Sequence, residues 1–194
     1  MRRSGGASIT LLIAGACLLA YSVVAGAAEH KFVGTAKCAV CHKTATAGEQ
    51  YPKWQASKHS KAYEALASPK ALEIAKAKGI ADPQKSMDCL KCHVTAAGVD
   101  TSMVGVKYSI KDGVGCESCH GAGADYIKKS TMEGLISGTI EKASVGLNMP
   151  DQATCEKCHN KESPTFTGFD FAKAKAAIAH PIPEERKAKY KSGG

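Results

Sequence analysis

The spacing of apolar and polar positions predicts short helices along most of this chain. Between positions 51 and 67, apolar residues recur at helical intervals, and His59 lies on the same face. Ser68 is placed to cap a second helix that ends at Gly79, and Asp170 to cap a third that runs to His180. The pattern therefore predicts a mostly α-helical protein.

Other stretches carry weaker patterns. Residues 104–110 have some strand character before the turn signal Asp112-Gly113, which makes them a hairpin candidate. Residues 80–88 predict a loop, and residues 125–150 are polar, contain glycine and carry no histidine. The charged residues 184–194 predict a mobile tail.

The N-terminus reads as a targeting segment rather than as part of the fold. Two arginines precede an apolar run from about position 7 to 24, and small residues follow it up to Ala27. We expect a signal peptide over 1–27 and one domain over 28–194, exported to the periplasm or beyond the cell, with no membrane span after cleavage. Cys17 lies inside the apolar run and is expected to leave with it. A lipoprotein site at this cysteine fits less well, because the usual Leu three positions earlier is missing.

The remaining eight cysteines form four copies of one unit, Cys-x-x-Cys-His. The copies are Cys38, Cys41 and His42; Cys89, Cys92 and His93; Cys116, Cys119 and His120; and Cys155, Cys158 and His159. Two thiols at this spacing add to the two vinyl groups of one haem, and the following histidine ligates its iron. The units therefore predict four covalently bound haem c groups.

A Cys-x-x-Cys pair alone also fits a zinc site, a redox dithiol or a disulfide framework. The chain has only seven histidines, yet one follows each of the four pairs directly, which favours haem over these alternatives. Thioether bonds would use all eight cysteines. With only 6% aromatic residues, we expect the porphyrins to serve as the core.

The formal net charge of +8 does not indicate nucleic-acid binding here. Loss of Arg2 and Arg3 with the signal peptide leaves +6. Eight haem carboxylates, offset by the ferric irons, bring the total to about +2 when oxidised and about −2 when reduced. The lysines are therefore expected to offset haem carboxylates and to contact redox partner proteins.

The units and their surroundings resemble the tetrahaem cytochrome c-554 family. The likeness rests on the order of the four units, on the stretch 113–121, on residues 88–98 and on residues 169–180. The resemblance implies a helical package with closely stacked haem pairs that transfers electrons in the periplasm. It also implies that His59 and His180 are distal ligands and that the haem of His93 is five-coordinate.

The resemblance is incomplete between the third and fourth units. The family has a distal histidine there, for the haem of the first unit in the family pattern, and this chain has none between Gly121 and Thr154. After the four proximal histidines, only His30, His59 and His180 remain, so at least one iron lacks a distal histidine from its own chain. We expect His30 to replace the missing ligand, in its own molecule or in a neighbour. The axial alternatives are Met87, Met103, Met132 and Met149, although packing is the simpler role for each.

These observations favour an electron carrier over two other functions. Bis-histidine ligation saturates the iron and leaves electron transfer as the main chemistry. A five-coordinate haem at His93 would instead allow reduction of a small ligand such as nitric oxide, although no acid or base beside it can be identified. The histidine deficit also allows self-association into a conductive filament, as in small extracellular tetrahaem cytochromes that this chain resembles in size. The short interval between the second and third units predicts that their haems are neighbours.

Overall fold

The computed structural model describes residues 30–191, so the predicted signal peptide lies outside the described residues. The described chain is built from short helices joined by long loops. The α-helices are α1 (Thr35–His42), α2 (Gln50–Ala56), α3 (Ala62–Ala65), α4 (Pro69–Ala77), α5 (Met87–His93), α6 (Cys116–His120), α7 (Lys129–Ser137), α8 (Gln152–Glu156), α9 (Phe171–Ile178) and α10 (Glu184–Lys191). The 3₁₀ turns are η1 (Ala45–Ala47), η2 (His59–Lys61), η3 (Thr101–Met103), η4 (Ile110–Asp112) and η5 (Lys142–Val145). The mostly α-helical class is confirmed.

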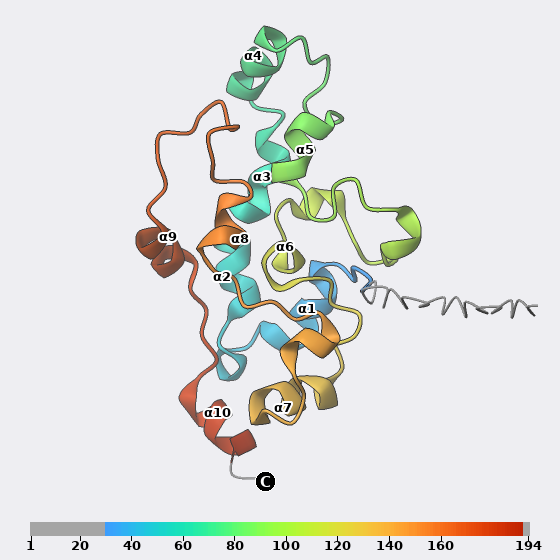
Figure 1. The fold of residues 1–194 in the computed structure, drawn as a ribbon, viewed down its shortest axis with the longest axis vertical. Coiled ribbons are helices and arrows are strands. Elements are labelled where there is room, and N and C mark those ends of the chain that lie inside the picture. The colour runs from blue at the N-terminus through green and yellow to red at the C-terminus, as the bar shows by residue number, and fades with distance from the viewer. Residues whose placement is uncertain (1–29, 192–194) are drawn as a thin grey trace, which may run out of the picture.

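The molecule is elongated, with α4 at one end and α7 and α10 at the other (Figure 1). α1, α2 and α6 lie between these ends, and α9 lies along one side (Figure 1). α10 packs against α7, and α1 packs against both α2 and α6. The first and third Cys-x-x-Cys-His units, on α1 and α6, therefore lie side by side.

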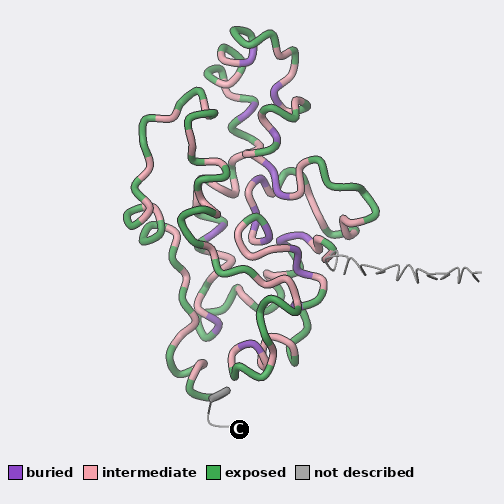
Figure 2. The backbone as a smooth tube through the Cα atoms, viewed as in Figure 1, coloured by how far each residue is buried: buried purple, intermediate pink, exposed green. Residues whose placement is uncertain are grey.

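Buried residues are scattered along the middle of the chain rather than gathered into one core (Figure 2). The largest buried group joins Leu66, Leu90 and Val94, which hold α3 against α5. No described side chain is less than 2% exposed, while Val40, inside the first unit, is 71% exposed. A chain of this length normally buries about two thirds of its surface around a continuous core. The protein groups alone do not form such a core, as expected if porphyrins complete it.

Two predicted helices form as expected, each with its capping side chain. The Ser68 hydroxyl accepts the Ala71 amide hydrogen at the start of α4, and Gly79 follows the helix end with φ +69°. The Asp170 carboxylate accepts the Lys173 amide hydrogen at the start of α9. α9 ends at Ile178, so His180 lies just beyond the helix instead of in its last turn.

The continuous helix predicted over 51–67 is wrong. Ser57 is extended, and its hydroxyl donates to the Trp54 carbonyl, so a side chain takes a backbone acceptor and the helix stops at Ala56. The chain resumes as η2, which starts at His59, and then as α3. Because of this break, the orientation of His59 does not depend on α2. The Val114 amide donates a hydrogen bond to the His59 carbonyl at 3.0 Å.

Two other assignments are corrected, and one helix had not been predicted. Residues 104–110 form no hairpin, because the β pairing in the described chain is a single parallel bridge between Phe32 and Val104. Residues 125–150 contain α7, whose signal was masked by Gly134 in its interior. The predicted mobile tail forms α10 over residues 184–191. Glutamates in its first turn and lysines further along suit the helix dipole. A charged segment was therefore mistaken for a disordered one.

Candidate haem-binding site

The Cys-x-x-Cys-His units lie on short helical turns that direct each unit to one side. α1, α5 and α6 each end at the histidine of their unit. Residues three and four positions apart share a helix face, so the two cysteines and the histidine of a unit point the same way. In the fourth unit, α8 ends at Glu156. The amides of Cys158 and His159 still bond to the Cys155 carbonyl, which continues the turn. All four units thus present two thiols and one imidazole together.

Hydrogen bonds orient three of the four unit histidines. The Nδ1 atoms lie 3.2 Å from Gln50 Oε1 for His42, 2.7 Å from the Ala62 carbonyl for His93, and 3.0 Å from the Asn148 carbonyl for His120. A backbone carbonyl can only accept, so Nδ1 carries the hydrogen in His93 and His120, and Nε2 keeps a free lone pair. This is the arrangement in which a histidine ligates a metal through Nε2. His159 is instead stacked on Phe169, with ring centres 4.8 Å apart.

Two histidines from outside the units face unit histidines. His59 faces His159 with ring centres 6.0 Å apart, and His180 faces His120 with ring centres 5.9 Å apart. Two imidazoles that bind one metal at about 2.0 Å from each nitrogen hold their ring centres roughly 6 Å apart. The His180 Nδ1 donates to the Ile178 carbonyl at 2.8 Å, which leaves its Nε2 free. Both pairs therefore fit two axial ligands of one iron.

Burial keeps the ligand-competent neutral form of these rings. It lowers the pKa of His59, His42 and His120 below the ordinary histidine value. The Arg186 guanidinium, a nearby positive charge, lowers the pKa of His42 further. A neutral imidazole is the form that binds a metal.

Several thiols lie near a thiol of another unit. Cys38 hydrogen-bonds with Cys116, which lowers the pKa of Cys38 and raises that of Cys116. Burial, together with the nearby Cys92, raises the pKa of Cys158 to about 12. Burial and then the charge of Cys155 raise the pKa of Cys119. These pairs bring the first unit near the third, the third near the fourth, and the fourth near the second. Thr95, two residues after His93, also hydrogen-bonds with Ser118 of the third unit at 2.7 Å, and that the haems of these two units are neighbours stays a prediction. The eight cysteines are all unpaired thiols in the described chain.

His30 lies apart from the paired imidazoles. Its Nδ1 is 2.6 Å from Asp125 Oδ2, its side chain is 19% exposed, and its ring lies against Gly146. Within residues 30–191, no ring contact joins His30 to a unit histidine, and none joins His42 or His93 to a distal imidazole. The proposed ligand role of His30 stays a prediction. Among the methionine alternatives, Met87 and Met149 are 49% and 59% exposed, and Met132 lies on α7.

Sequence reasoning missed Glu117, the residue between Cys116 and Ser118. Glu117 is 4% exposed, and its carboxylate accepts the backbone amides of Val33, Gly34 and Gly123 at 2.7–2.9 Å. It therefore ties the segment before α1 to the loop after α6. A glutamate inside a unit that is flanked by glycines, at Gly115 and Gly121, was the available signal. Gln50, which holds His42, gave none.

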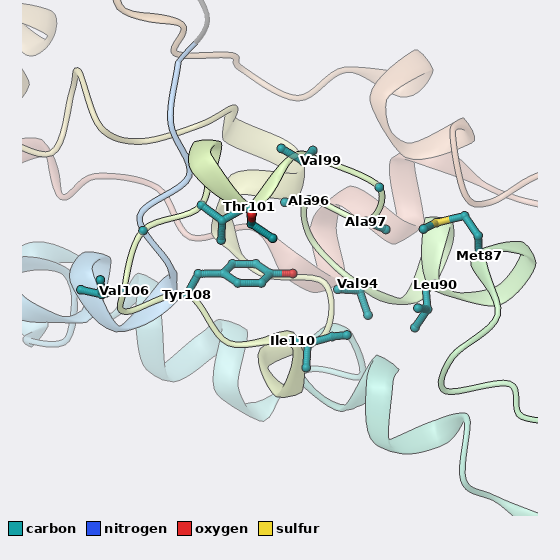
Figure 3. A pocket seen from close by; sticks show the side chains of 13 residues that line it. Met87, Leu90, Val94, Ala96, Ala97, Val99, Thr101, Val106, Tyr108 and Ile110 are labelled. Atoms are coloured by element: carbon teal, nitrogen blue, oxygen red, sulfur yellow. The ribbon is translucent and has the colours of Figure 1, made fainter.

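An apolar pocket of about 450 Å³ lies behind the second unit (Figure 3). Met87 and Leu90 line it from α5, three positions apart on one side of the helix, and Val94 lines it from the extended residue just after α5. Tyr108 crosses the pocket and donates its hydroxyl hydrogen to the Thr95 carbonyl (Figure 3). The pocket therefore lies on the side of α5 that faces away from the thiols of Cys89 and Cys92.

In residues 30–191, no helix is both long enough and apolar enough to cross a bilayer.

Two family models and a curated relative match the chain. The family model "Cytochrome c554 and c-prime" matches residues 37–121, and the model "Cytochrome c3" matches residues 81–168. The chain is 34% identical over 196 aligned residues to cytochrome c-554 of Nitrosomonas europaea, with 92% of this chain and 77% of that protein covered. No solved structure gave a significant match.

Proposed function

The chain belongs to the cytochrome c-554 family of multihaem c-type cytochromes, and from that premise we propose that it is an exported tetrahaem electron carrier. The proposal takes residues 1–27 as a signal peptide and residues 28–194 as one domain, which would act in the periplasm or outside the cell and exchange electrons with redox partner proteins. The observation that carries it is the pairing of His59 with His159 and of His180 with His120 at about 6 Å.

Four sets of residues would hold the haems. The thiols are those of Cys38 and Cys41, Cys89 and Cys92, Cys116 and Cys119, and Cys155 and Cys158; the proximal ligands are His42, His93, His120 and His159. When bound, haem c supplies reversible one-electron chemistry at its iron. His180 would be the second axial ligand at the third unit, and His59 at the fourth. Two histidines on one iron leave no position for a substrate, which favours electron transfer there.

The thiol contacts support a single path through the molecule. Cys38 against Cys116, Cys119 beside Cys155, and Cys92 against Cys158 order the units as first, third, fourth and second. We propose that electrons enter at one end of this series and leave at the other. The first and second units, at the two ends, are those whose histidines have no distal imidazole in the described chain.

Spectroscopy of the ferric protein tests the ligand assignment. We expect near-infrared and EPR signals of two bis-histidine low-spin haems, and a haem content of four per chain. The variant H59A should remove one bis-histidine signal and leave the haem content at four. H30A is the companion variant and tests the predicted ligand role of His30, which is held by Asp125 in this structure: loss of a low-spin signal supports that role, and unchanged spectra refute it. Unchanged spectra in H59A would refute the assignment of His59 to the haem of His159.

Reduction of a small ligand is a second candidate function, favoured by the lack of an imidazole facing His93 within the described residues. Under this alternative, the haem of the second unit is five-coordinate and binds nitric oxide. Stopped-flow mixing of the reduced protein with nitric oxide distinguishes the two functions. Binding that yields a stable adduct supports the carrier, whereas reoxidation of all four haems with consumption of nitric oxide supports the reductase.

The filament alternative depends on His30 ligating a haem in a neighbouring molecule. In this structure the His30 ring lies against Gly146 and is held by Asp125. Filament formation would therefore require His30 to leave both contacts. Sedimentation velocity tests the alternative directly: a single species of about the monomer mass at micromolar concentration would exclude a constitutive filament, and large species that H30A abolishes would establish one.

A further inference from the structure

The chain uses arginine once after its third residue. It has 23 lysines but only three arginines, and two of these, Arg2 and Arg3, lie in the predicted signal peptide. The third is Arg186. Arginine differs from lysine in its planar fork of donors, which binds carboxylates through two parallel hydrogen bonds. A single arginine among lysines therefore points to a position that requires the planar guanidinium and its paired donors, and not only a positive charge.

Arg186 lies in the first turn of α10, close to the first unit. The chain entering α10 packs on Gly48, where an added Cβ would lie 2.7 Å from the Pro181 carbonyl oxygen and 3.0 Å from Pro183 Cδ. Two residues after Gly48, Gln50 holds the His42 imidazole. The residues just before α10 and His42 therefore contact the same short segment, Gly48 to Gln50. α10 is further held by packing against α7, at the same end of the molecule (Figure 1).

The Arg186 amide donates to the Pro183 carbonyl at 3.0 Å, and Pro183 packs on Gly48. Arg186 therefore extends from the turn of chain that leads to Gln50 and His42. Within the described residues, Arg186 forms no ion pair, whereas the adjacent Lys187 pairs with Glu184 at 2.6 Å. Arg186 is also only partly exposed. A partly buried guanidinium is costly unless it meets an anion.

We propose that Arg186 is a positioning residue that binds a carboxylate of the haem attached to Cys38 and Cys41, and so fastens α10 over the first unit. This inference rests on the proposed function, because it requires a haem at that unit. Haem carboxylates are planar two-oxygen anions, which match the arginine fork. α10 lies beyond the segments that both family models match, which end at residues 121 and 168.

The pairing has a redox consequence. A positive charge near a haem favours the reduced iron, which carries one positive charge fewer than the oxidised iron. Arg186 therefore raises the midpoint potential of the first haem relative to the same haem without it. This charge would make the midpoint potential of the first haem differ from that of the second haem, at the other end of the proposed electron path.

A redox titration of the four-haem protein tests the inference with three variants. R186Q removes the charge and the fork, R186K keeps the charge but loses the fork, and K187Q removes one charge from the same turn of α10. We expect R186Q to shift the midpoint potential of one haem downward and to increase hydrogen exchange in residues 184–191. R186K should restore part of the potential, and K187Q should leave all four potentials at their wild-type values.

Each other outcome overturns the assignment. Four unchanged potentials in R186Q, with four haems still attached, would refute the contact while leaving the electron-carrier function intact. A wild-type chain with fewer than four haems would instead refute the function on which the contact depends. If the wild-type potential follows added phosphate and R186Q abolishes that response, Arg186 binds a free anion and not a haem carboxylate.

Discussion

Replacing Glu117 by glutamine should destabilise the protein although it barely changes the size of the side chain. Glu117 Oε1 accepts the amides of Val33 and Gly123, and Oε2 accepts the amide of Gly34. A glutamine can place its one carbonyl oxygen at the first position only. Its NH₂ group then faces the Gly34 amide, so that two donors meet in a site that is 4% exposed.

The magnitude follows from the number of donors left without an acceptor. A hydrogen bond to a charged group contributes about 1.5–3 kcal/mol, and an unsatisfied buried donor costs about 1–3 kcal/mol. E117Q loses one such bond and weakens two others, which predicts a loss of about 2–3 kcal/mol in the free energy of unfolding. E117A leaves all three amides without a partner and should cost more than E117Q. For a chain of this size, the E117Q loss corresponds to a fall of roughly 4–12 °C in Tm.

Guanidinium unfolding, followed by far-ultraviolet circular dichroism, measures the loss, because covalent haems stay attached in the unfolded chain. The matched control is E64Q, which changes a glutamate that is 78% exposed and lies 3.9 Å from Lys61. Surface changes of this kind stay within about 0.5 kcal/mol of wild type. If E117Q also falls within that range, the carboxylate does not tie the segment before α1 to α6, and the reasoning is refuted.

Three further substitutions test the site and its supports. G113A should displace His59 and remove the bis-histidine signal of the fourth unit, because an added Cβ would lie 2.7 Å from the His59 carbonyl oxygen; G138A also has positive φ but meets nothing within 4 Å, so its spectrum should stay unchanged. W54F should lower the unfolding free energy by about 1 kcal/mol, since it removes the 2.8 Å hydrogen bond from Trp54 Nε1 to the Val114 carbonyl; an unchanged denaturation midpoint would contradict this. S68A should cost about 1 kcal/mol through loss of the α4 cap, measured by the same unfolding experiment, with an intact midpoint as the contrary result.

Local chemistry explains why parts of the fold could be predicted. Ser68 and Asp170 were recognisable as caps, because capping depends on a side chain and an amide three residues away. The break after Ala56 was not recognisable, since the Ser57 hydroxyl could equally have pointed to solvent. α7 and α10 were missed for a related reason: their stability depends on packing against each other, and neither has a strong pattern of its own.

The sequence by itself determined the chemistry of the site. Each Cys-x-x-Cys-His unit lies within five consecutive residues, and one helical turn is enough to bring its two thiols and its imidazole together. The histidine count likewise established that a fully bis-histidine set of four haems is impossible within one chain.

Only the tertiary structure decided which residues meet across the chain. His59 faces His159 and His180 faces His120 across 100 and 60 positions, and α1 packs against α6, which brings the first and third units together. Such contacts depend on how loops of many residues close, and no local pattern encodes that closure. For the same reason the sequence could not show that its one late arginine, Arg186, lies beside His42, because α10 must first fold and pack at the far end of the molecule.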